Sequence, residues 1–424
     1  MAHECNPESE TVPLLAYNLY KSLSRLADVT LVTHERNRAA LEKSRKGEEI
    51  GYMRESPLLS RYYVLMSRFF KADGYINNWF VFHAAYQAIH RGFDKEVERH
   101  FAGRVRSGEY DVVHAITPMI PRYPYRISKA CQKTPFILGP VNGGLPYPKG
   151  FREIGKREFS ELGFLRELTR FIPGYMDTYR RADKVLAGST HTLNFLKETH
   201  HLSGGRIELF FENGVEKDFF HTREDNKGGA GGVNILFVGR LVPYKCADMV
   251  VEAFSRLEPD VLSKSSLTIV GDGPERHSLE AQASRQGIAG KVRFTGWVEH
   301  GKITAHYRKA DIFCFPSVRE FGGAVVLEAM ANGLPCIVVR HGGIGDYVTP
   351  GAGYSIEPIS REQVIEELRE KISMLAEDGG LRKRISENAY EEAKKHEWGK
   401  KAENLIRIYE EAIKNKDENR LHGV

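Results

Sequence analysis

The chain has 424 residues, of which 41% are hydrophobic and 28% charged, and a formal net charge of +5. This length exceeds what one core usually supports, so we expect a globular protein of two domains. Apolar stretches fall short of the ~18 residues that span a bilayer, and no charged-then-apolar leader opens the chain, so we expect a cytoplasmic location. The five cysteines are scattered without metal-ligand spacing, which favours reduced thiols and no metal site.

The excess of positive charge lies in residues 1–215. A basic surface can face anionic lipid or an acidic substrate, and it can equally have no specific partner. No zinc-finger, RNP or KH signature is present, so we expect no nucleic-acid partner.

The first residues depart from the usual pattern of a doubly wound domain. A helical pattern occupies residues 12–26 and a strand follows at 29–33. An apolar strand would normally precede that first helix, and residues 1–11 show none. Either this strand is very short or the chain is truncated there.

Residues 54–110 are rich in aromatic and basic side chains and are predicted to be mostly helical. Such a segment can form core, lie on a membrane surface or line an acceptor groove. Core is the more common outcome. The aromatic residues are Tyr62, Tyr63, Phe69, Phe70, Tyr75, Trp79, Phe80, Phe82 and Tyr86, and the basic ones are Arg54, Arg61, Arg68 and Lys71.

Regular alternation of strands and helices begins near residue 111. Strands are predicted at 112–116, 136–138, 184–187 and 207–211, with a glycine-containing loop at 139–144. Ser189 can cap the helix after the third of these strands. The glycine-rich segment 224–232 marks the seam to a second domain. We therefore assign residues 1–215 to a first Rossmann-like domain.

The second domain, 216–395, reads as a cleaner βα series. Its strands are predicted at 234–238, 267–270, 292–295, 312–315 and 336–339, with helices at 246–257, 274–287, 301–310 and 324–332. This alternation gives a parallel sheet, whose ligands bind at the carboxyl ends of the strands. A capping box at Ser360 opens a helix that ends near Gly379, and a long charged helix covers 390–414.

The stretch 311–343 carries the strongest local signal. Glu320 stands in the loop after a buried strand, and Glu328 stands on the helix that follows. Gly322 and Gly323 lie where that helix starts. Glycines allow close backbone approach, and a helix N-terminus favours negative charge, so this layout suits a phosphate group. A carboxylate one turn further on suits hydroxyl donors such as a ribose.

Other strand ends of the second domain carry residues that fit the same ligand. Gly239 and Arg240 follow the first strand, with Lys245 five residues later, and Gly271 follows the second strand. Arg and Lys neutralise phosphate oxygens. Arg240 and Lys245 alone could equally form surface salt bridges. As an ordered set, these strand ends predict a site for a nucleotide diphosphate.

At this point the sequence resembles a known family, the retaining glycosyltransferases of family 4. The resemblance rests on Glu320 and Glu328 as the E-x7-E motif, on Gly239-Arg240 with Lys245, on Gly271-Asp272-Gly273-Pro274, on Asn213-Gly214-Val215 and on Glu328-Ala329-Met330-Ala331-Asn332-Gly333. It covers the second domain specifically and the first domain loosely. It implies the α/β GT-B fold, in which two Rossmann-like doubly wound domains face a central cleft, and residues 396–424 form a closing helix towards the first domain.

The resemblance also implies roles for individual residues. Arg240 and Lys245 would neutralise the leaving diphosphate, Glu328 would hold the ribose hydroxyls, and Glu320 would contact the donor sugar. The amides after Gly322 would cradle phosphate, and His114 would contact the sugar near the reacting carbon. The remaining residues expected to bind the donor are Gly143, Gly239, Gly271, Val298, Gly323, Ala324 and Val325.

The reaction implied is transfer of a sugar from a nucleotide-sugar to a hydroxyl acceptor with retention, and without a metal or other cofactor. The donor base, UDP or GDP, and the oligomeric state stay open. We expect a sugar, polysaccharide or lipid-linked acceptor, with peripheral association at the inner membrane face as an option. The alternatives are a nucleotide-sugar epimerase of the same fold and a non-catalytic nucleotide-sugar-binding protein.

Overall fold

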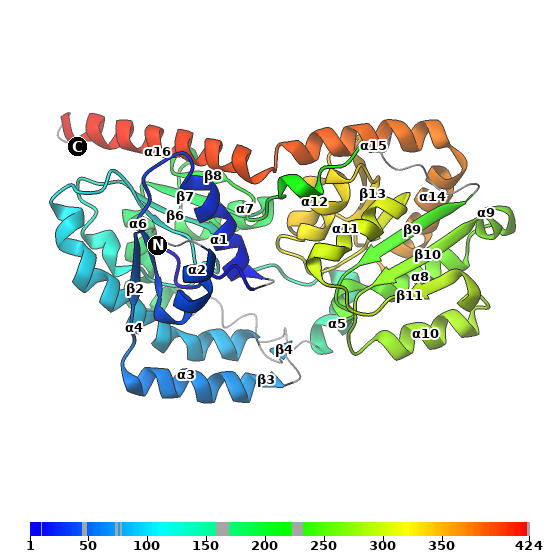
Figure 1. Cartoon of the computed structure of the whole chain (residues 1–424), viewed down its shortest axis with the longest axis horizontal. Coiled ribbons are helices and arrows are strands. Elements are labelled where there is room, and N and C mark those ends of the chain that lie inside the picture. Colours follow the sequence, from blue (N-terminus) through cyan, green and yellow to red (C-terminus); the bar gives the residue numbers. More distant parts are fainter. Residues whose placement is uncertain are drawn as a thin grey trace. The chain divides into compact units, whose positions relative to one another are not determined.

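The computed structural model describes residues 1–9, 11–44, 49–72, 75–76, 79–157, 169–222 and 232–421, and for 70–80 only the backbone. The chain forms two compact α/β units (Figure 1). The first comprises Met1–Gly144, Glu158–Glu212 and Trp398–Val424, and the second comprises Leu145–Arg157 and Asn213–Glu397. The segment Leu145–Arg157 thus lies with the second unit, although the sequence analysis assigned it to the first domain.

The first unit is built on parallel strands. The strands β5 (Val113–Ala115), β6 (Phe136–Val141), β7 (Lys184–Ala187) and β8 (Ile207–Leu209) form one sheet in that order. A parallel pair, β1 (Leu31–His34) and β2 (Ile50–Met53), forms another. The predicted loop 139–144 therefore begins inside β6, which is longer than its apolar run suggested.

Residues 1–3 join these two sheets. The amide of Ala2 donates to Val32 of β1 over 2.8 Å, and the amide of Ile116, next to β5, donates to Met1 over 2.9 Å. Ala2 also forms a parallel bridge with Thr117. Residues 1–3 therefore take the place of the first strand expected of a doubly wound domain, between β1 and β5. Of the two alternatives, the structure shows a very short strand. Three residues are too few to leave a periodic signal in the sequence.

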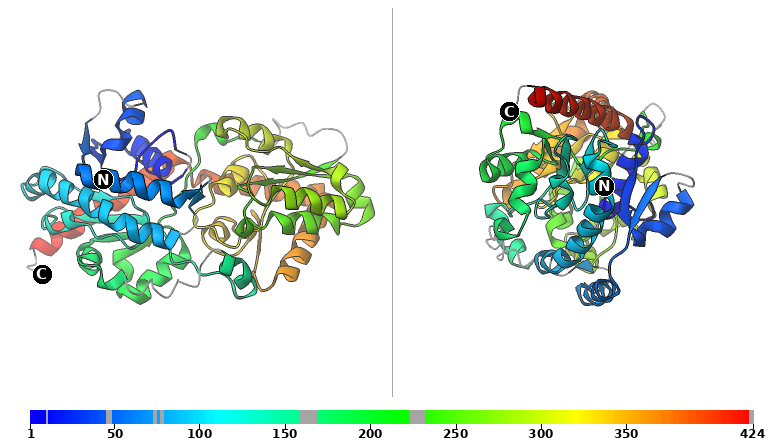
Figure 2. Two further views of the ribbon diagram at one scale, coloured as in Figure 1. Left: turned by 90° about the horizontal axis from the view of Figure 1, so that it is seen from below. Right: turned by 90° about the vertical axis from the view of Figure 1, so that its left-hand side faces the viewer.

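Helices cover both faces of this sheet layer (Figure 2). Residues Ala16, Leu19 and Leu23 of α1 share one core with Leu405 and Ile408 of α16. The predicted helix cap at Ser189 is confirmed, because its side chain accepts the Thr192 amide. The helices of this unit are α1 (Val12–Leu23), α2 (Arg38–Ser44), α3 (Pro57–Phe70), α4 (Trp79–Arg106), α6 (Tyr175–Arg181), α7 (Thr190–His200) and α16 (Trp398–Leu421).

The aromatic segment 54–110 divides into a buried and an exposed part. Phe82 and Tyr86 of α4 are buried in the core, whereas Tyr62 and Phe69 of α3 are exposed. The side chains of Phe70, Tyr75, Trp79 and Phe80 lie outside the described residues. Between the two helices, β3 (Lys71–Ala72) and β4 (Tyr75–Ile76) pair antiparallel. The prediction of core is confirmed for α4 but wrong for one face of α3.

The second unit has one six-stranded parallel sheet in the order β11-β10-β9-β12-β13-β14. This order reverses at β9 and β12, the arrangement in which ligands bind beyond the carboxyl ends of the strands. The five predicted strands are confirmed within two residues. The strands are β9 (Val233–Val238), β10 (Ser265–Val270), β11 (Val292–Phe294), β12 (Ile312–Phe315), β13 (Cys336–Val339) and β14 (Gly353–Ile356).

The sequence reasoning misjudged the helices near the C-terminal end of the chain. α15 was not predicted, because Gly379-Gly380 was interpreted only as a helix stop; Asp378 caps this new helix by accepting the Leu381 amide over 2.8 Å. The predicted helix 390–414 is in fact the end of α15 and the start of α16. The helices are α5 (Arg152–Arg157), α8 (Ala247–Ser255), α9 (Pro259–Ser263), α10 (Arg276–Arg285), α11 (His300–Lys309), α12 (Ala324–Ala331), α13 (Gly343–Tyr347), α14 (Arg361–Glu377) and α15 (Gly379–Lys394).

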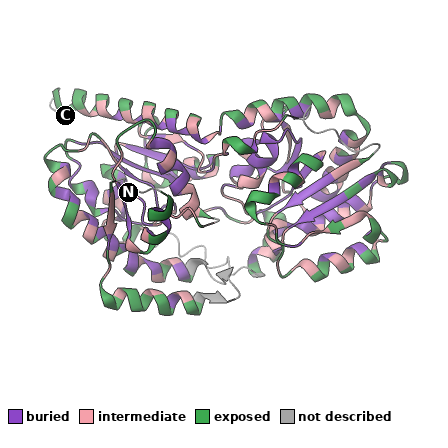
Figure 3. Ribbon diagram, in the orientation of Figure 1, coloured by how far each residue is buried: buried purple, intermediate pink, exposed green. Residues whose placement is uncertain are grey.

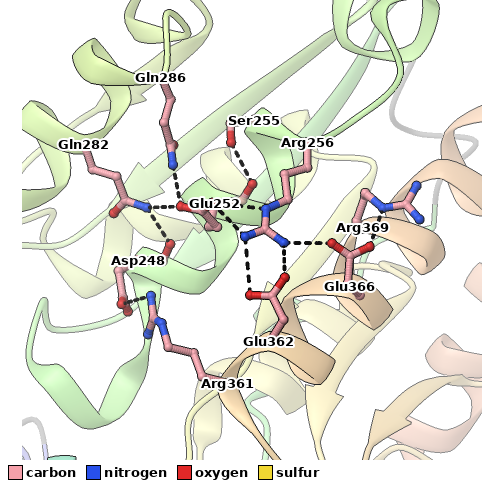
Figure 4. Close-up of polar contacts among 10 residues, drawn as sticks. All are labelled: Asp248, Glu252, Ser255, Arg256, Gln282, Gln286, Arg361, Glu362, Glu366 and Arg369. Atoms are coloured by element: carbon pink, nitrogen blue, oxygen red, sulfur yellow. Dashed lines mark hydrogen bonds and ion pairs between the residues drawn. The ribbon is translucent and has the colours of Figure 1, made fainter.

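A network of ion pairs ties the outer helices of the second unit together (Figure 4). The Arg256 guanidinium bonds Glu252 of α8 over 3.1 Å, and Glu366 of α14 over 2.8 Å. It also bonds Glu362 of α14. Because these groups are partly solvated, each pair contributes little alone, and the network mainly fixes α14 against α8.

In the described part of the chain, no helix is long and apolar enough to cross a membrane. All five cysteines are buried and unbridged, which confirms the expectation of free thiols.

We predict that acid destabilises the first unit. Burial lowers the pKa of His83 and His114 to about 3 and of His90 and His200 to about 4. An unfolded histidine titrates near 6.5, so below that pH the unfolded state binds protons that the folded state does not, and stability falls. Between pH 7.5 and 5.5 His83, His90 and His114 should each cost the first unit about 1 kcal/mol, and the less buried His200 should cost less.

Hydrogen exchange at these two pH values, corrected for intrinsic rates, measures this loss. Protection of β5–β7 should drop more than protection of the β9–β13 sheet, whose unit contains the half-buried His306 with a lowered pKa and serves as the internal comparison. Equal changes in both sheets would contradict the assignment.

Candidate functional site

The backbone is closely packed where the strands β9 and β10 of the second unit's sheet end. Beyond β9, the Gly239 amide donates to Val270 over 3.0 Å. Gly271 has a φ of +132°, and a Cβ built on it would stand 2.0 Å from the Gly239 carbonyl oxygen. Gly273 meets the Leu241 carbonyl in the same way, at 2.4 Å. Gly239 and Gly271, both predicted to bind the donor, are therefore side by side, and Gly271 must be glycine for packing alone.

The loop before α12 is held by a second loop, after β13. The Gly343 amide donates to the carbonyls of Glu320 and Phe321 over 3.2 and 3.1 Å. A Cβ on Gly343 would lie 2.0 Å from the Phe321 oxygen, and one on Gly342 would lie 2.0 Å from the Glu320 oxygen. Only glycines at both positions permit this approach, so the backbone around Glu320 is fixed by main-chain contacts.

Lys245 and Glu320 form an ion pair at the carboxyl ends of β9 and β12. The Lys245 ammonium bonds Glu320 Oε2, and the Ser317 hydroxyl donates to the same oxygen over 3.4 Å. The ammonium also lies 4.9 Å from the centre of the Phe315 ring. Burial disfavours the charged lysine, but the Glu320 carboxylate outweighs burial and raises the pKa of Lys245. The structure thus places a fixed, charged ammonium at the centre of the predicted phosphate site.

Glu328 is buried on α12 and held by two side chains of α11. The Tyr307 hydroxyl donates to Glu328 Oε2 over 2.9 Å, and His300 Nε2 lies 3.1 Å from Oε1. Burial and then the carboxylate raise the pKa of Tyr307 well above its ordinary value, so Tyr307 is a firm donor. The carboxylate is therefore oriented before any ligand binds.

The remaining predicted residues of the second unit follow β9, follow β11 or stand at the start of α12. Arg240 is exposed at the end of β9, and Val298 is half-buried two residues before His300. Gly322 is buried, and Gly323, with a φ of +53°, precedes the helix; a Cβ there would meet Glu320 Cγ at 2.9 Å. The half-buried Ala324 and Val325 form the first turn of α12.

His114 and Gly143 lie in the first unit. His114 Nε2 bonds the Gly139 carbonyl over 2.5 Å, and Nδ1 bonds the Tyr409 hydroxyl of α16 over 2.6 Å. The Gly143 amide donates to Thr192 Oγ1 over 3.2 Å. Both ring nitrogens of His114 are thus occupied, and contact with a donor sugar requires that one bond opens. That role of His114 stays a prediction.

The sequence analysis missed His300 and Tyr307, the two side chains that orient Glu328. They stand seven residues apart and therefore share one face of α11. The sequence signal that could have indicated them is a polar side chain at the start of the helix, His300, followed two turns later by the polar Tyr307. Leu145–Arg157 was also not predicted to join the second unit; its Pro146 carbonyl accepts a hydrogen bond from His341 Nε2 over 2.7 Å, next to the Gly342–Gly343 loop.

Among the described residues, no three His, Cys, Asp or Glu side chains are grouped so that they could hold a metal ion.

The sequence of the second unit matches a known family. Residues 221–392, less than half of the chain, match the family described as "Glycosyl transferases group 1". An uncharacterized glycosyltransferase of Methanocaldococcus jannaschii is 28% identical over 54% of this chain. D-inositol 3-phosphate glycosyltransferase 2 of Catenulispora acidiphila is 28% identical over 64% of it. The matched regions span 60% and 66% of these two curated relatives.

Solved structures match nearly the whole chain in fold. The crystal structure of HepE from Anabaena in complex with UDP has a TM-score of 0.61 at 15% identity, covering 96% of this chain and 98% of that one. The glycosyltransferase from Rickettsia africae has a TM-score of 0.62 at 16% identity, with 96% and 97% covered. The expected GT-B fold, with two Rossmann-like α/β units, is thereby confirmed.

We predict that Gly271→Ala destabilises the second unit. Its Cβ would overlap the Gly239 oxygen in a backbone conformation that favours glycine, and such strain costs about 1–3 kcal/mol. In a unit of this size the melting temperature should fall by roughly 2–12 °C. Gly290→Ala is the matched control, because a Cβ there meets no atom within 4 Å. Equal melting temperatures for the two variants would contradict the packing role of Gly271.

Proposed function

We propose that this protein is a glycosyltransferase that moves a sugar from a nucleotide-diphosphate donor to a hydroxyl acceptor, with retention at the anomeric carbon. One observation carries the proposal. The charged pair Lys245–Glu320 follows the strand ends of one doubly wound sheet, and the oriented carboxylate of Glu328 stands on α12, the helix after Glu320. The match to group 1 glycosyl transferases and the fold shared with UDP-bound HepE support it.

The diphosphate would lie against Arg240, Lys245 and the first turn of α12. Arg240 is exposed and can bind phosphate oxygens with its planar fork. Gly323, Ala324 and Val325 bring main-chain amides at the helix N-terminus, where the macrodipole favours negative charge. Gly239 and Gly271 leave the floor of this site free of side chains.

Glu328 would hold the ribose hydroxyls. A ribose hydroxyl donates hydrogen bonds, and a carboxylate accepts them strongly. Tyr307 and His300 fix the direction of both carboxylate oxygens, so little ordering remains to be done on binding. Val298, close to His300 in the chain, would lie near the base.

The leaving diphosphate gains negative charge as the bond to the anomeric carbon breaks. The Lys245 ammonium and the helix N-terminus are fixed beforehand, so they stabilise that charge without reorganising. The leaving phosphate oxygen can accept the acceptor's proton on the same face of the sugar, which gives retention. We propose that Glu320 positions the sugar, because the ammonium on Oε2 lowers its strength as a nucleophile.

Arg240 and Lys245 supply the positive charge that the leaving group needs, so we propose that transfer requires no metal. Full activity in excess EDTA would agree with this. We propose a sugar, polysaccharide or lipid-linked hydroxyl as the acceptor and a UDP- or GDP-sugar as the donor.

We predict that Arg240→Ala and Lys245→Ala each slow transfer at least about tenfold, equivalent to 1.4 kcal/mol of transition-state stabilisation. Arg240 is exposed, so its loss should leave the melting temperature unchanged. Lys245→Ala leaves the Glu320 carboxylate without its ammonium and should also lower stability. The measurement is kcat/KM for the nucleotide-sugar that a thermal-shift panel identifies as donor. Wild-type rates in the Arg240 variant would refute the diphosphate assignment.

The stereochemistry of the product tests the reaction itself. Proton NMR of the first turnovers should show the donor's anomeric configuration in the product, whereas inversion would refute retention. A trapped glycosyl-Glu320 adduct would refute the same-face route. An epimerised sugar formed from donor alone would instead favour an epimerase.

We predict that Tyr307→Phe weakens donor binding about tenfold, because a hydrogen bond to a charged group contributes roughly 1.5–3 kcal/mol. KM for the donor should rise while kcat changes less than threefold, since Tyr307 acts through Glu328. Calorimetric titration with the nucleoside diphosphate gives the affinity directly. Tyr354→Phe, a conservative change on the half-buried β14, is the control. A fall in kcat with unchanged affinity would contradict this positioning role.

A further inference from the structure

The helix α3 of the first unit carries two apolar stripes, of which one packs against the first unit and the other is largely exposed. Met66 is buried, and Tyr63 packs against the first unit's core. Leu59 reaches α4, where its Cδ1 would stand 2.6 Å from a Cβ on Gly92. These three residues follow the spacing i, i+4, i+7, so they form the face that docks on α4.

The second stripe is exposed. Leu58, Leu65 and Phe69 are 77%, 69% and 79% exposed. Tyr62, at the edge of this stripe, is 37% exposed and donates its hydroxyl to the Ala85 carbonyl of α4 over 3.2 Å. Figure 3 shows exposed positions along α3, which lies outside α4 in Figure 1. A soluble surface rarely gathers so many large apolar side chains on one helix, and such a patch marks an interaction site.

The charge along this helix is of one sign. Residues 57–70 contain Arg61 and Arg68 and no aspartate or glutamate. Both arginines are exposed, and they stand three residues after Leu58 and Leu65 respectively, so they share the exposed face. The partner must therefore accept apolar side chains and guanidinium groups together.

We propose that α3 lies in the surface of a bilayer containing anionic lipids, with Leu58, Leu65 and Phe69 among the acyl chains and Arg61 and Arg68 at the headgroups. An apolar stripe with interleaved arginines is what an interfacial helix needs, because long basic side chains reach the headgroups while their stems stay apolar. Anionic headgroups supply the complementary charge. The docking is independent of the transfer reaction, and it would bring the first unit to a surface that holds lipid-linked hydroxyl acceptors.

Flotation of the full-length protein with vesicles tests this docking. Vesicles of phosphatidylcholine with 30% phosphatidylglycerol should bind the protein at least tenfold more tightly than pure phosphatidylcholine, at a ratio that falls with salt. Leu58→Gln/Leu65→Gln should lose at least tenfold in binding to the anionic vesicles. Arg61→Gln/Arg68→Gln should abolish most of the preference for anionic lipid while keeping the melting temperature.

The chain offers a matched control in Ile359→Gln/Leu421→Gln, which removes two aliphatic side chains that are 70% and 83% exposed elsewhere. This variant should bind as the wild type does. The proposal is overturned if Leu58→Gln/Leu65→Gln floats like the wild type, or if the wild type does not bind anionic vesicles. It is also overturned if sedimentation shows that the Leu58/Leu65 change only converts a dimer to a monomer, because the stripe would then face a second copy.

Discussion

The ion pair between Lys245 and Glu320 is the interaction on which the second unit's site depends. A buried ammonium is costly unless a carboxylate compensates it, and Glu320 does so from a loop whose backbone is fixed by Gly342 and Gly343. The pair links the ends of β9 and β12, the two strands at which the sheet order reverses. The pair thereby holds the charged Lys245 ammonium at the position where a doubly wound sheet binds its ligand.

The rest of the site follows from how the same loops pack. Gly271 and Gly273 are glycines because the neighbouring backbone leaves no room for a Cβ. Arg240 is exposed after β9, and Glu328 on α12 is held by Tyr307. Packing alone therefore accounts for these glycines, which is why glycine patterns alone are weak evidence for function.

Much of this architecture could be predicted from the sequence, because β12 and β13 are unbroken apolar runs and their carboxyl ends carry distinctive residues. The predictions failed where the local signal was short or ambiguous. The three N-terminal residues are too few to show a hydrophobic periodicity. The strand β14 has only one fully buried position, so it lacks the apolar run by which the other strands were predicted. Gly379-Gly380 has the composition of a helix stop but forms the first turn of α15, two residues after α14 ends. His300 and Tyr307 acquire meaning only through contact with Glu328, which no local pattern reveals.

The most direct test of the central claim is a crystal structure of this protein with the nucleoside diphosphate that binds it. The account predicts the β-phosphate within hydrogen-bond distance of Lys245 Nζ and the first-turn amides of α12, with the ribose hydroxyls on the Glu328 carboxylate. A diphosphate bound away from the α12 N-terminus, or a ribose that does not contact Glu328, would contradict it.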